Sequence, residues 1–565
     1  MSTGSFWSSR WLLGAIVVVV WIVLLITASR STLWDRDEAR YATAALEMEK
    51  SGNLLYPTFN QELRAAKPVM IYWLMAASIQ VLGPNELGVR FVSTLAIALV
   101  CLLTGLIARE FLETGAMAAV IAGTSPMLIL VGTAATTDAT LLFFILLAEW
   151  VFVQAWLNGP RRWHVPVMGA AIGLALLTKG PVGLAVPVLS IATALALARG
   201  RSEAGAFATK LALAGALGVL IFLAWGIPAN AATGGEYWRI AMAEGMPRRL
   251  FTAMENHGGE GLVPFLLHLP YYPLVLVVGF LPWTIFLALV PQSLRNLETP
   301  APNWARSPQG LRVLLTGMIV PTFVLMTLVV SKLPHYIQPV FPWFAILAAA
   351  ALQAAGSAAF AATAARRMRV AFVVFAMAGL LAAAALIAVP WLWLPLASLR
   401  GAGAFLGLFT AGLLAVLTWF YWQGRLQTAA RIHAAGMMAW LLACAFLVLP
   451  SLEQMVKPAQ LLAREIQPQI PPAAAIAALG WHEPGMHFYL GARRISHLHG
   501  ASDLGSWLQG EGPRLLIVNE NAAAGISPPP PGFRLLATRR GIDHVHGGGI
   551  RLTAFLREEI PDRRP

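Results

Sequence analysis

Thirteen apolar runs divide this sequence, and no other feature restricts its fold as strongly. Each run is long enough, or nearly so, to cross the roughly 30 Å of hydrocarbon in a bilayer as a helix. With 58% hydrophobic residues, the chain exceeds the apolar share of soluble proteins, about 45–50%. The sequence therefore predicts an α-helical polytopic membrane protein. The runs lie at residues 11–28, 90–108, 115–131, 138–157, 164–178, 181–198, 211–228, 270–291, 311–330, 336–355, 370–390, 403–421 and 432–450.

Basic residues between the runs predict the direction of each crossing. The chain holds 40 Lys and Arg against 27 Asp and Glu, and most of this excess lies in every second short connection. Cytoplasmic loops carry such a bias, so we expect a cytoplasmic amino terminus, an outer carboxyl end and no nucleic-acid partner. The first run is longer than the roughly 7–15 residues of a signal peptide core and is expected to remain as an anchor.

Three outer regions follow from this topology. Two are long loops, at 29–89 and 229–269, and the third is the tail at 451–565. Apolar runs in the tail shrink to strand length and are separated by Gly, Pro and Ser, which predicts strands near 515–519, 533–537 and 550–556 and a helix at 458–466. We therefore expect a transmembrane domain at 1–450 and a small soluble α/β domain at 451–565.

The first outer loop has the densest charge of the chain. Its stretch from Trp34 to Trp73 holds eleven Asp, Glu, Lys and Arg residues, although only 12% of the chain is charged. Residues 37–51 have helical spacing of apolar positions, and 69–82 is apolar but too short to span, which indicates an interfacial helix. Ionisable groups held against a membrane are costly, so this loop is predicted to form a pocket at the membrane surface.

Three carboxylates are candidates for catalysis. Asp37 and Glu38 follow each other on a helix, so their side chains diverge by about 100° and only one can face the pocket while the other caps or pairs. We assign Asp37 as the general base; the alternative is that Asp35 or Asp37 only caps the helix. Asp138 begins the fourth run at the same outer face, either as a second site carboxylate or as a helix cap.

Cations on the outer side are not explained by topology. Arg40, Arg64, Lys67, Lys179 and Lys332 form an excess that fits an anionic ligand, most plausibly a phosphate, although each alone can be a membrane anchor. Tyr41, on the helix at 37–51, is a further cavity candidate.

Two outer histidines, His257 and His335, are candidates for proton transfer or metal binding, or else for structural hydrogen bonds. No sequence motif supports a divalent metal, so no metal ligand and no cofactor is assigned.

Several segments resemble one family in order along the chain: DEARYA (37–42), KPVMIYW (67–73), TTDATLLFF (136–144), LTKGP (177–181), GFLPW (279–283), SKLPHYIQP (331–339) and HFYLG (487–491). They look like the bacterial lipid A 4-amino-4-deoxy-L-arabinose transferases and the wider protein-mannosyltransferase-like superfamily of GT-C membrane glycosyltransferases. The resemblance implies an inverting transferase of the bacterial inner membrane that passes a sugar from a polyprenyl (undecaprenyl) phosphate donor to lipid A or another envelope acceptor at the periplasmic face. An alternative is a protein O-mannosyltransferase with the same class of donor; a flippase for a lipid-linked sugar is another.

The resemblance also implies roles for individual residues. Asp37 matches the essential acidic position of the family and Lys67 the lysine that holds the donor phosphate, while Asp138 and Tyr336 match positions that line the cavity. The chain departs from the family just before this lysine, where Arg64-Ala65-Ala66 replaces a typical Tyr-Phe-Glu run. The missing glutamate argues against a metal there, and the missing tyrosine leaves the phosphate to Arg64 or Arg40.

Overall fold

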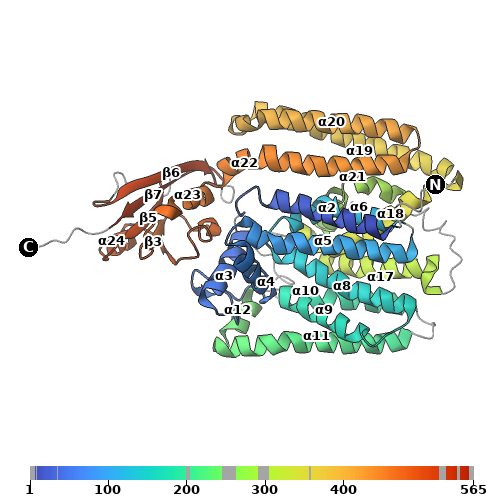
Figure 1. Cartoon of the computed structure of the whole chain (residues 1–565), viewed down its shortest axis with the longest axis horizontal. Coiled ribbons are helices and arrows are strands. Elements are labelled where there is room, and N and C mark those ends of the chain that lie inside the picture. The colour runs from blue at the N-terminus through green and yellow to red at the C-terminus, as the bar shows by residue number, and fades with distance from the viewer. Residues whose placement is uncertain are drawn as a thin grey trace, which may run out of the picture.

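The computed structural model describes residues 7, 9–34, 36–112, 114–198, 204–244, 262–290, 304–355, 358–520, 530–543 and 547–558. A long bundle of helices leads at one end into a small sheet domain, and the amino terminus lies at the far end of the bundle (Figure 1). The predicted polytopic α-helical architecture with a small C-terminal α/β domain is confirmed.

Nine helical segments of the described residues are long and apolar enough to cross a membrane. They are α2 (Arg10–Ala28), α5 (Glu86–Phe111), α8 (Thr137–Asn158), α11 (Ala204–Ala232), α17 (Pro308–Leu328), η3 (Pro334–Val340) continued by α18 (Phe341–Ala354), α19 (Ala358–Leu392), η4 (Leu394–Leu399) continued by α20 (Arg400–Trp422), and α21 (Leu426–Ala443) continued to the end of α22 (Leu449–Val456). The shorter apolar helices α9 (His164–Lys179) and α10 (Val182–Leu197) coincide with two more of the predicted runs.

The remaining two runs are bent helix pairs. In the first, α6 (Gly115–Gly123) meets α7 (Pro126–Gly132) at 66°, and in the second, residues 263–279 meet η1 (Trp283–Leu289) at 111°. The first bend follows from its sequence, because Pro126 has no N–H to continue the helix. The side chains of Thr124 and Ser125 instead donate to the carbonyls of Val120 and Ile121, at 2.6 and 2.7 Å.

Helices differ in how much of their surface is packed against protein. In the most apolar 18-residue stretch of α8, 78% of the sequence is buried inside the protein, against 11% in the corresponding stretch of α19. Helix α8 is therefore central, and α19 exposes its apolar side chains at the periphery. Small residues allow the close packing near the centre. A Cβ on Gly123 of α6, for example, would lie 2.8 Å from the methyl groups of Val20.

The C-terminal domain is a five-stranded mixed sheet with helices α23 (Pro458–Ile466) and α24 (Ala501–Leu508). Its strands are β3 (Ala475–Leu479), β4 (Ile495–Leu498), β5 (Arg514–Asn519), β6 (Arg534–Ile542) and β7 (Gly549–Arg557), in the order β4-β3-β5-β7-β6. The three predicted strands and the predicted helix are present, whereas β3 and β4 were not predicted. Strand β3 pairs in parallel with β4 and β5, which leaves β4 at the edge of the sheet.

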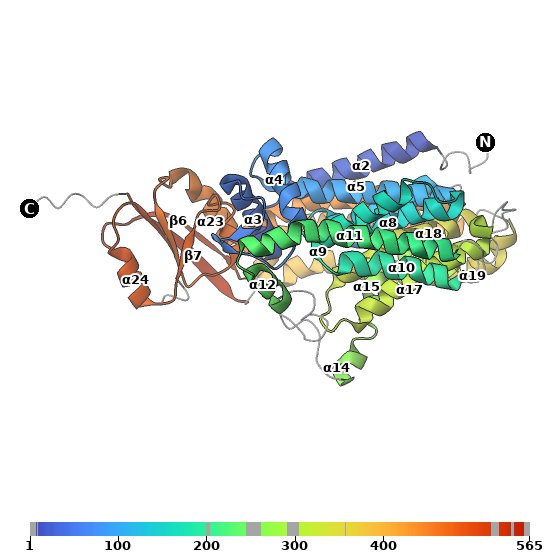
Figure 2. The same ribbon diagram turned by 90° about the horizontal axis from the view of Figure 1, so that it is seen from below.

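Elements of the two outer loops lie where the bundle meets this domain (Figures 1 and 2). The first loop forms α3 (Asp37–Ser51), a short hairpin of β1 (Thr58–Phe59) and β2 (Glu62–Leu63), and α4 (Met70–Leu82). The second contributes α12 (Glu236–Glu244). Because both loops reach the same end of the bundle, residues far apart in sequence surround one space there.

Candidate active site

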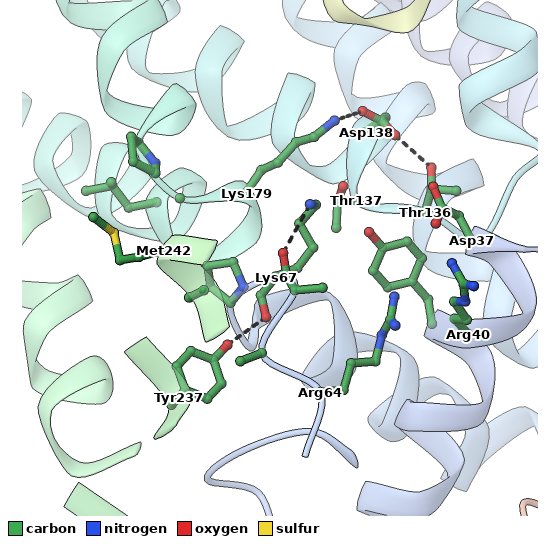
Figure 3. A pocket seen from close by; sticks show the side chains of 18 of the residues that line it. Asp37, Arg40, Arg64, Lys67, Thr136, Thr137, Asp138, Lys179, Tyr237 and Met242 are labelled. Carbon is green, nitrogen blue, oxygen red and sulfur yellow. Dashed lines mark hydrogen bonds and ion pairs between the residues drawn. The ribbon is translucent and has the colours of Figure 1, made fainter. Parts of the chain in front are cut away.

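A cavity of about 930 Å³ opens at this end of the bundle. Its walls come from α3, the loop between β2 and α4, the start of α8, the end of α9, the end of α11, α12 and the loop before η3. Nine residues predicted from the sequence line it: Asp37, Arg40, Tyr41, Arg64, Lys67, Asp138, Lys179, His335 and Tyr336. Figure 3 shows Asp37 beside Arg40, with Lys67 between them and the pair of Lys179 and Asp138.

Helix α3 brings Asp37 to the cavity without using it as a cap. The helix begins at Asp37 itself, its cap residue is Arg36, and no side chain caps it. Asp35 lies outside the described residues, and so does His257, the other histidine predicted for the site. The carboxylate of Asp37 is therefore available to a ligand in the cavity.

Glu38 faces away from the cavity, which corrects its assignment as a catalytic candidate. Its carboxylate accepts hydrogen bonds from Arg90 Nε and Nη2 at 2.6 and 2.7 Å, and from the backbone N–H groups of Trp34 and Ala135, both at 2.7 Å. Both side chains of the ion pair are almost fully buried. This agrees with the expectation that only one of the two adjacent carboxylates faces the pocket, and it makes Glu38 a structural residue.

Arg90 is the partner that the sequence did not reveal. It begins the second apolar run, where we interpreted it as part of a span. A signal was present, because an arginine at the outer edge of a span is not explained by the positive-inside bias.

Asp138, at the start of α8, lines the cavity among polar partners. Its carboxylate accepts hydrogen bonds from Lys179 Nζ and, at 3.1 Å, from Thr136 Oγ1. His335 Nε2 lies 3.8 Å from the same carboxylate. Tyr336 lies close by, because its ring centroid is 5.2 Å from Lys179 Nζ. Asp138 is thus held by a cation, whereas Asp37 faces open space.

The loop before α4 carries two cations into the cavity. Arg64 lies 5.6 Å from the ring centroid of Tyr41. Burial alone would lower the pKa of Arg64, but Tyr72, Tyr41 and Asp37 outweigh this effect and raise it, so Arg64 stays charged. Burial, together with Asp37, raises the pKa of Tyr41 well above its ordinary value, so Tyr41 is a neutral hydrogen-bond donor.

The backbone of Lys67 is fixed by the second outer loop. The hydroxyl of Tyr237 on α12 donates to the Lys67 carbonyl at 2.7 Å, and the Lys67 ammonium donates to the Ala66 carbonyl at 3.1 Å. Among the described residues that line the cavity there are four Lys and Arg side chains against two Asp side chains. The cavity is therefore positively charged in this part, as an anionic ligand requires.

Lys332 was predicted to bind phosphate, but it is not among the described residues that line the cavity. Its ammonium donates to the carbonyls of Met326, Thr327 and Val329, at 3.2, 2.5 and 2.5 Å. These carbonyls lie at the end of α17, where a helix leaves acceptors without partners. Lys332 is thus a helix-capping residue.

Aromatic and apolar side chains form a wall that sequence analysis missed. Phe222, Trp225, Tyr237, Trp238 and Met242 line the side of the cavity made by α11 and α12. None of these five residues is among the site residues predicted from the sequence. The described residues contain no group of three His, Cys, Asp or Glu side chains that could hold a metal ion.

Comparison with known proteins relates this arrangement to one group of enzymes. The family model of dolichyl-phosphate-mannose-protein mannosyltransferases matches residues 66–227. An undecaprenyl phosphate-alpha-4-amino-4-deoxy-L-arabinose arabinosyl transferase of Pectobacterium carotovorum is 32% identical over 342 residues, 59% of this chain and 58% of that protein. A protein of the same description from Pseudomonas fluorescens is 30% identical over 61% of this chain and 60% of its own length. The chain thus spans about three fifths of the length of these curated relatives, and the predicted resemblance is confirmed.

Solved structures extend the likeness to nearly the whole chain. The crystal structure of ArnT from Cupriavidus metallidurans bound to undecaprenyl phosphate matches with a TM-score of 0.74 and 20% identity, over 97% of this chain and 98% of that one. The same protein in the apo state matches with a TM-score of 0.69 and 21% identity. The GT-C membrane fold is therefore shared from end to end.

Proposed function

From this shared fold and the charges of the cavity, we propose that the chain is an inverting GT-C glycosyltransferase that uses a polyprenyl-phosphate sugar as donor. One observation carries the proposal. A single cavity at the end of the membrane bundle combines an available carboxylate, Asp37, with a cluster of cations and an apolar wall. These are the three surfaces that a lipid-linked sugar phosphate needs.

The donor would occupy the cavity with its phosphate at Arg40, Arg64 and Lys67. Its prenyl chain would lie along the aromatic wall of α11 and α12 and continue into the membrane. When the bond between the sugar and the phosphate breaks, negative charge develops on the leaving phosphate. Fixed cations stabilise this charge more in the transition state than in the ground state, and this difference is what lowers the barrier.

Asp37 would act as the general base. An acceptor hydroxyl or phosphate would attack the anomeric carbon from the side opposite the donor phosphate, its proton would pass to the Asp37 carboxylate, and the carbon–oxygen bond to the donor phosphate would break, with inversion. Asp138, held by Lys179 and Thr136, would orient the sugar or the acceptor. No step in this scheme requires a metal.

We propose the periplasmic face of a bacterial inner membrane as the place of reaction. Support comes from Arg109 in the last turn of α5 and from Arg161 and Arg162 in the connection after α8, because these helix ends lie at the end of the bundle away from α3 and α12 (Figure 1). Basic residues at these ends favour the cytoplasm, so the proposed orientation has the cavity and the C-terminal domain outside. Lipid A, or another envelope glycan, is the proposed acceptor because the relatives are named for aminoarabinose transfer.

The reaction can be tested with purified protein in lipid nanodiscs. Radiolabelled undecaprenyl-phosphate sugars, with aminoarabinose, a neutral pentose and a hexose as separate donors, would be incubated with lipid A or with a peptide acceptor. Label in lipid A supports the proposal, and label in the peptide favours the O-mannosyltransferase type. Movement of donor across the bilayer without transfer to either acceptor would favour a flippase and overturn the proposal.

Two variants test the roles of residues. Asp37→Asn should abolish transfer while the protein still folds and binds undecaprenyl phosphate, and an active Asp37→Asn protein would remove the base assignment. Lys67→Ala should weaken binding of undecaprenyl phosphate, and unchanged affinity would contradict its role. Arg539→Ala is a suitable control, because Arg539 pairs with Glu465 on the exposed surface of the C-terminal domain.

A further inference from the structure

The hairpin of β1 and β2 leads directly to the cations of the cavity. Its strands have only two residues each, with Thr58 opposite Leu63, and Arg64 follows at once. Phe59 of this hairpin and Arg64 both line the cavity. A ribbon this short is not stable alone in water, so contacts from outside must hold it in place.

One support comes from α3. The carboxylate of Glu47 accepts a hydrogen bond from Thr58 Oγ1 at 2.5 Å and lies 3.3 Å from the backbone nitrogen of Gln61, which donates to it. This contact fixes the hairpin on the side of the membrane domain.

The other support comes from the C-terminal domain. The side-chain amide of Asn60 donates to the carbonyl of Ile495 at 3.0 Å, and its oxygen accepts from the N–H of Ile495 at 2.7 Å. Ile495 begins β4, the edge strand, whose other side pairs with β3. Asn60 therefore fills the open edge of the sheet as the backbone of a further strand would.

A ring contact beside this pair reaches the cavity wall. The rings of Phe59 and the buried His487 lie with centroids 4.8 Å apart. The domain is also tied to the membrane part nearby, since Tyr489 donates to Glu86 at 2.7 Å and accepts from the N–H of Leu33 at 2.7 Å. The C-terminal domain is thus docked where it can hold the hairpin still.

We infer that the C-terminal domain is a working part of the transferase site, and that Asn60 is the positioning residue through which it holds Arg64 and Lys67 in place for the donor phosphate. This inference rests on the proposed function. It assigns a role to the domain through the hydrogen bonds between Asn60 and Ile495, which lie 435 residues apart in the sequence. If the hairpin is released, the cations are still present but occupy their binding positions for only a fraction of the time. The apparent affinity for the donor is then the intrinsic affinity multiplied by that fraction.

The turn offers a matched pair of variants. Asn60 and Gln61 both have positive φ, 56° and 65°, a conformation that glycine adopts without strain. Asn60→Gly removes the side-chain amide that forms hydrogen bonds with Ile495, whereas Gln61→Gly removes an exposed side chain of the same turn. Because both variants introduce one glycine into this turn, they add the same conformational entropy to the unfolded chain. Asn60→Asp keeps the acceptor for the Ile495 N–H and should be intermediate.

Kinetics and binding in nanodiscs give the first readout. Loss of two ordinary hydrogen bonds corresponds to about a ten-fold change. Asn60→Gly should raise the donor KM and the Kd for undecaprenyl phosphate by about this factor with kcat within about two-fold, and Gln61→Gly should leave all three within about two-fold. Equal effects of the two variants, or a loss in kcat alone, would overturn the inference.

Hydrogen exchange without donor gives a second readout that does not depend on the reaction. Backbone amides of residues 57–69 should exchange faster in Asn60→Gly than in Gln61→Gly, while those of α3 stay protected. Equal exchange in the two variants would show that the domain does not hold the hairpin. If the wild-type protein neither binds undecaprenyl phosphate nor transfers sugar, the proposed function fails, and this measurement still decides whether the domain holds the hairpin.

Discussion

The buried ion pair of Glu38 and Arg90 predicts a large loss of stability when one partner is removed. Besides the carboxylate, the Arg90 guanidinium donates to the carbonyls of Ala28, Ser31 and Thr32 at 2.7, 2.6 and 3.0 Å. Arg90→Met would leave the carbonyls of Ala28 and Ser31 without this donor, although Thr32 keeps Lys457 Nζ, and would leave a carboxylate buried without its cation. Breaking such a pair costs about 3–5 kcal/mol.

The same change should disturb the site, because Glu38 connects its two halves. One oxygen of Glu38 accepts from Trp34, just before α3, and the other from Ala135, just before the segment that carries Asp138. Asp37 and Asp138 therefore keep their separation through Glu38. We expect Arg90→Met to lower the rate of transfer as well as the unfolding temperature.

Thermal unfolding in detergent, followed by tryptophan fluorescence, is the assay. The control is Arg539→Ala, whose exposed pair with Glu465 is worth about 0.2–1 kcal/mol. Glu38→Met combined with Arg90→Met should recover part of the loss, because an apolar pair leaves no buried charge. If Arg90→Met unfolds at the temperature of the control, the reasoning is refuted.

Acid should weaken the ion pair of Glu38 and Arg90. Burial alone would raise the pKa of Glu38, but the charge and hydrogen bonds of Arg90 and the N–H groups of Trp34 and Ala135 outweigh it and lower the pKa below 4.5. A carboxyl whose pKa is depressed by folding stabilises the protein fully above the pKa of the unfolded chain, and this contribution is lost as the pH falls through the folded pKa. The wild-type unfolding temperature should thus fall more steeply below about pH 4.5 than that of Glu38→Gln.

Two further predictions concern other residues around the site. Burial raises the pKa of Glu47 above 4.5, so its contribution to stability has the opposite pH dependence and is lost as the pH rises through the folded pKa. Glu47→Gln should therefore reduce the fall of the unfolding temperature as the pH rises above 4.5, and an unchanged profile would contradict this. Lys332→Met should destabilise the protein by about 1–3 kcal/mol in thermal unfolding, because carbonyls at the end of α17 lose their donor, and it should leave undecaprenyl phosphate affinity within about two-fold. A large loss of affinity with unchanged stability would return Lys332 to the phosphate site.

Much of the architecture follows from local pattern. A run of apolar residues long enough to span can satisfy its backbone in a membrane only as a helix, so the positions of the runs determine the positions of the helices. Charged residues between two such runs must lie at the membrane surface, which is why Asp37, Arg40, Arg64 and Lys67 could be placed together before the fold was known. The break at Pro126 was less evident, because apolar residues continue on both sides of it.

Pairing between distant segments could not be predicted in the same way. Lys67 and Lys332 have similar local sequences, since each is followed closely by a proline and then by an apolar segment. Only the fold shows that Lys332 reaches the carbonyl end of α17, whereas Lys67 lies in the cavity. Likewise, Glu38 and Asp37 are neighbours in sequence, but Glu38 pairs with Arg90, 52 residues away, whereas Asp37 lines the cavity.

These pairings set the balance of charge around the cavity. Lys179 pairs with Asp138 and Arg90 with Glu38, and Arg40, Arg64 and Lys67 line the described part of the cavity together with Asp37. A polyprenyl-phosphate sugar is a phosphodiester with one negative charge, and the polyprenyl phosphate left after transfer is a monoester with nearly two. A surplus of fixed positive charge therefore favours the state in which the bond to the sugar is breaking over the intact donor. In the proposed reaction, the pairing of the other ions within the fold thus makes the cavity complementary to the leaving phosphate.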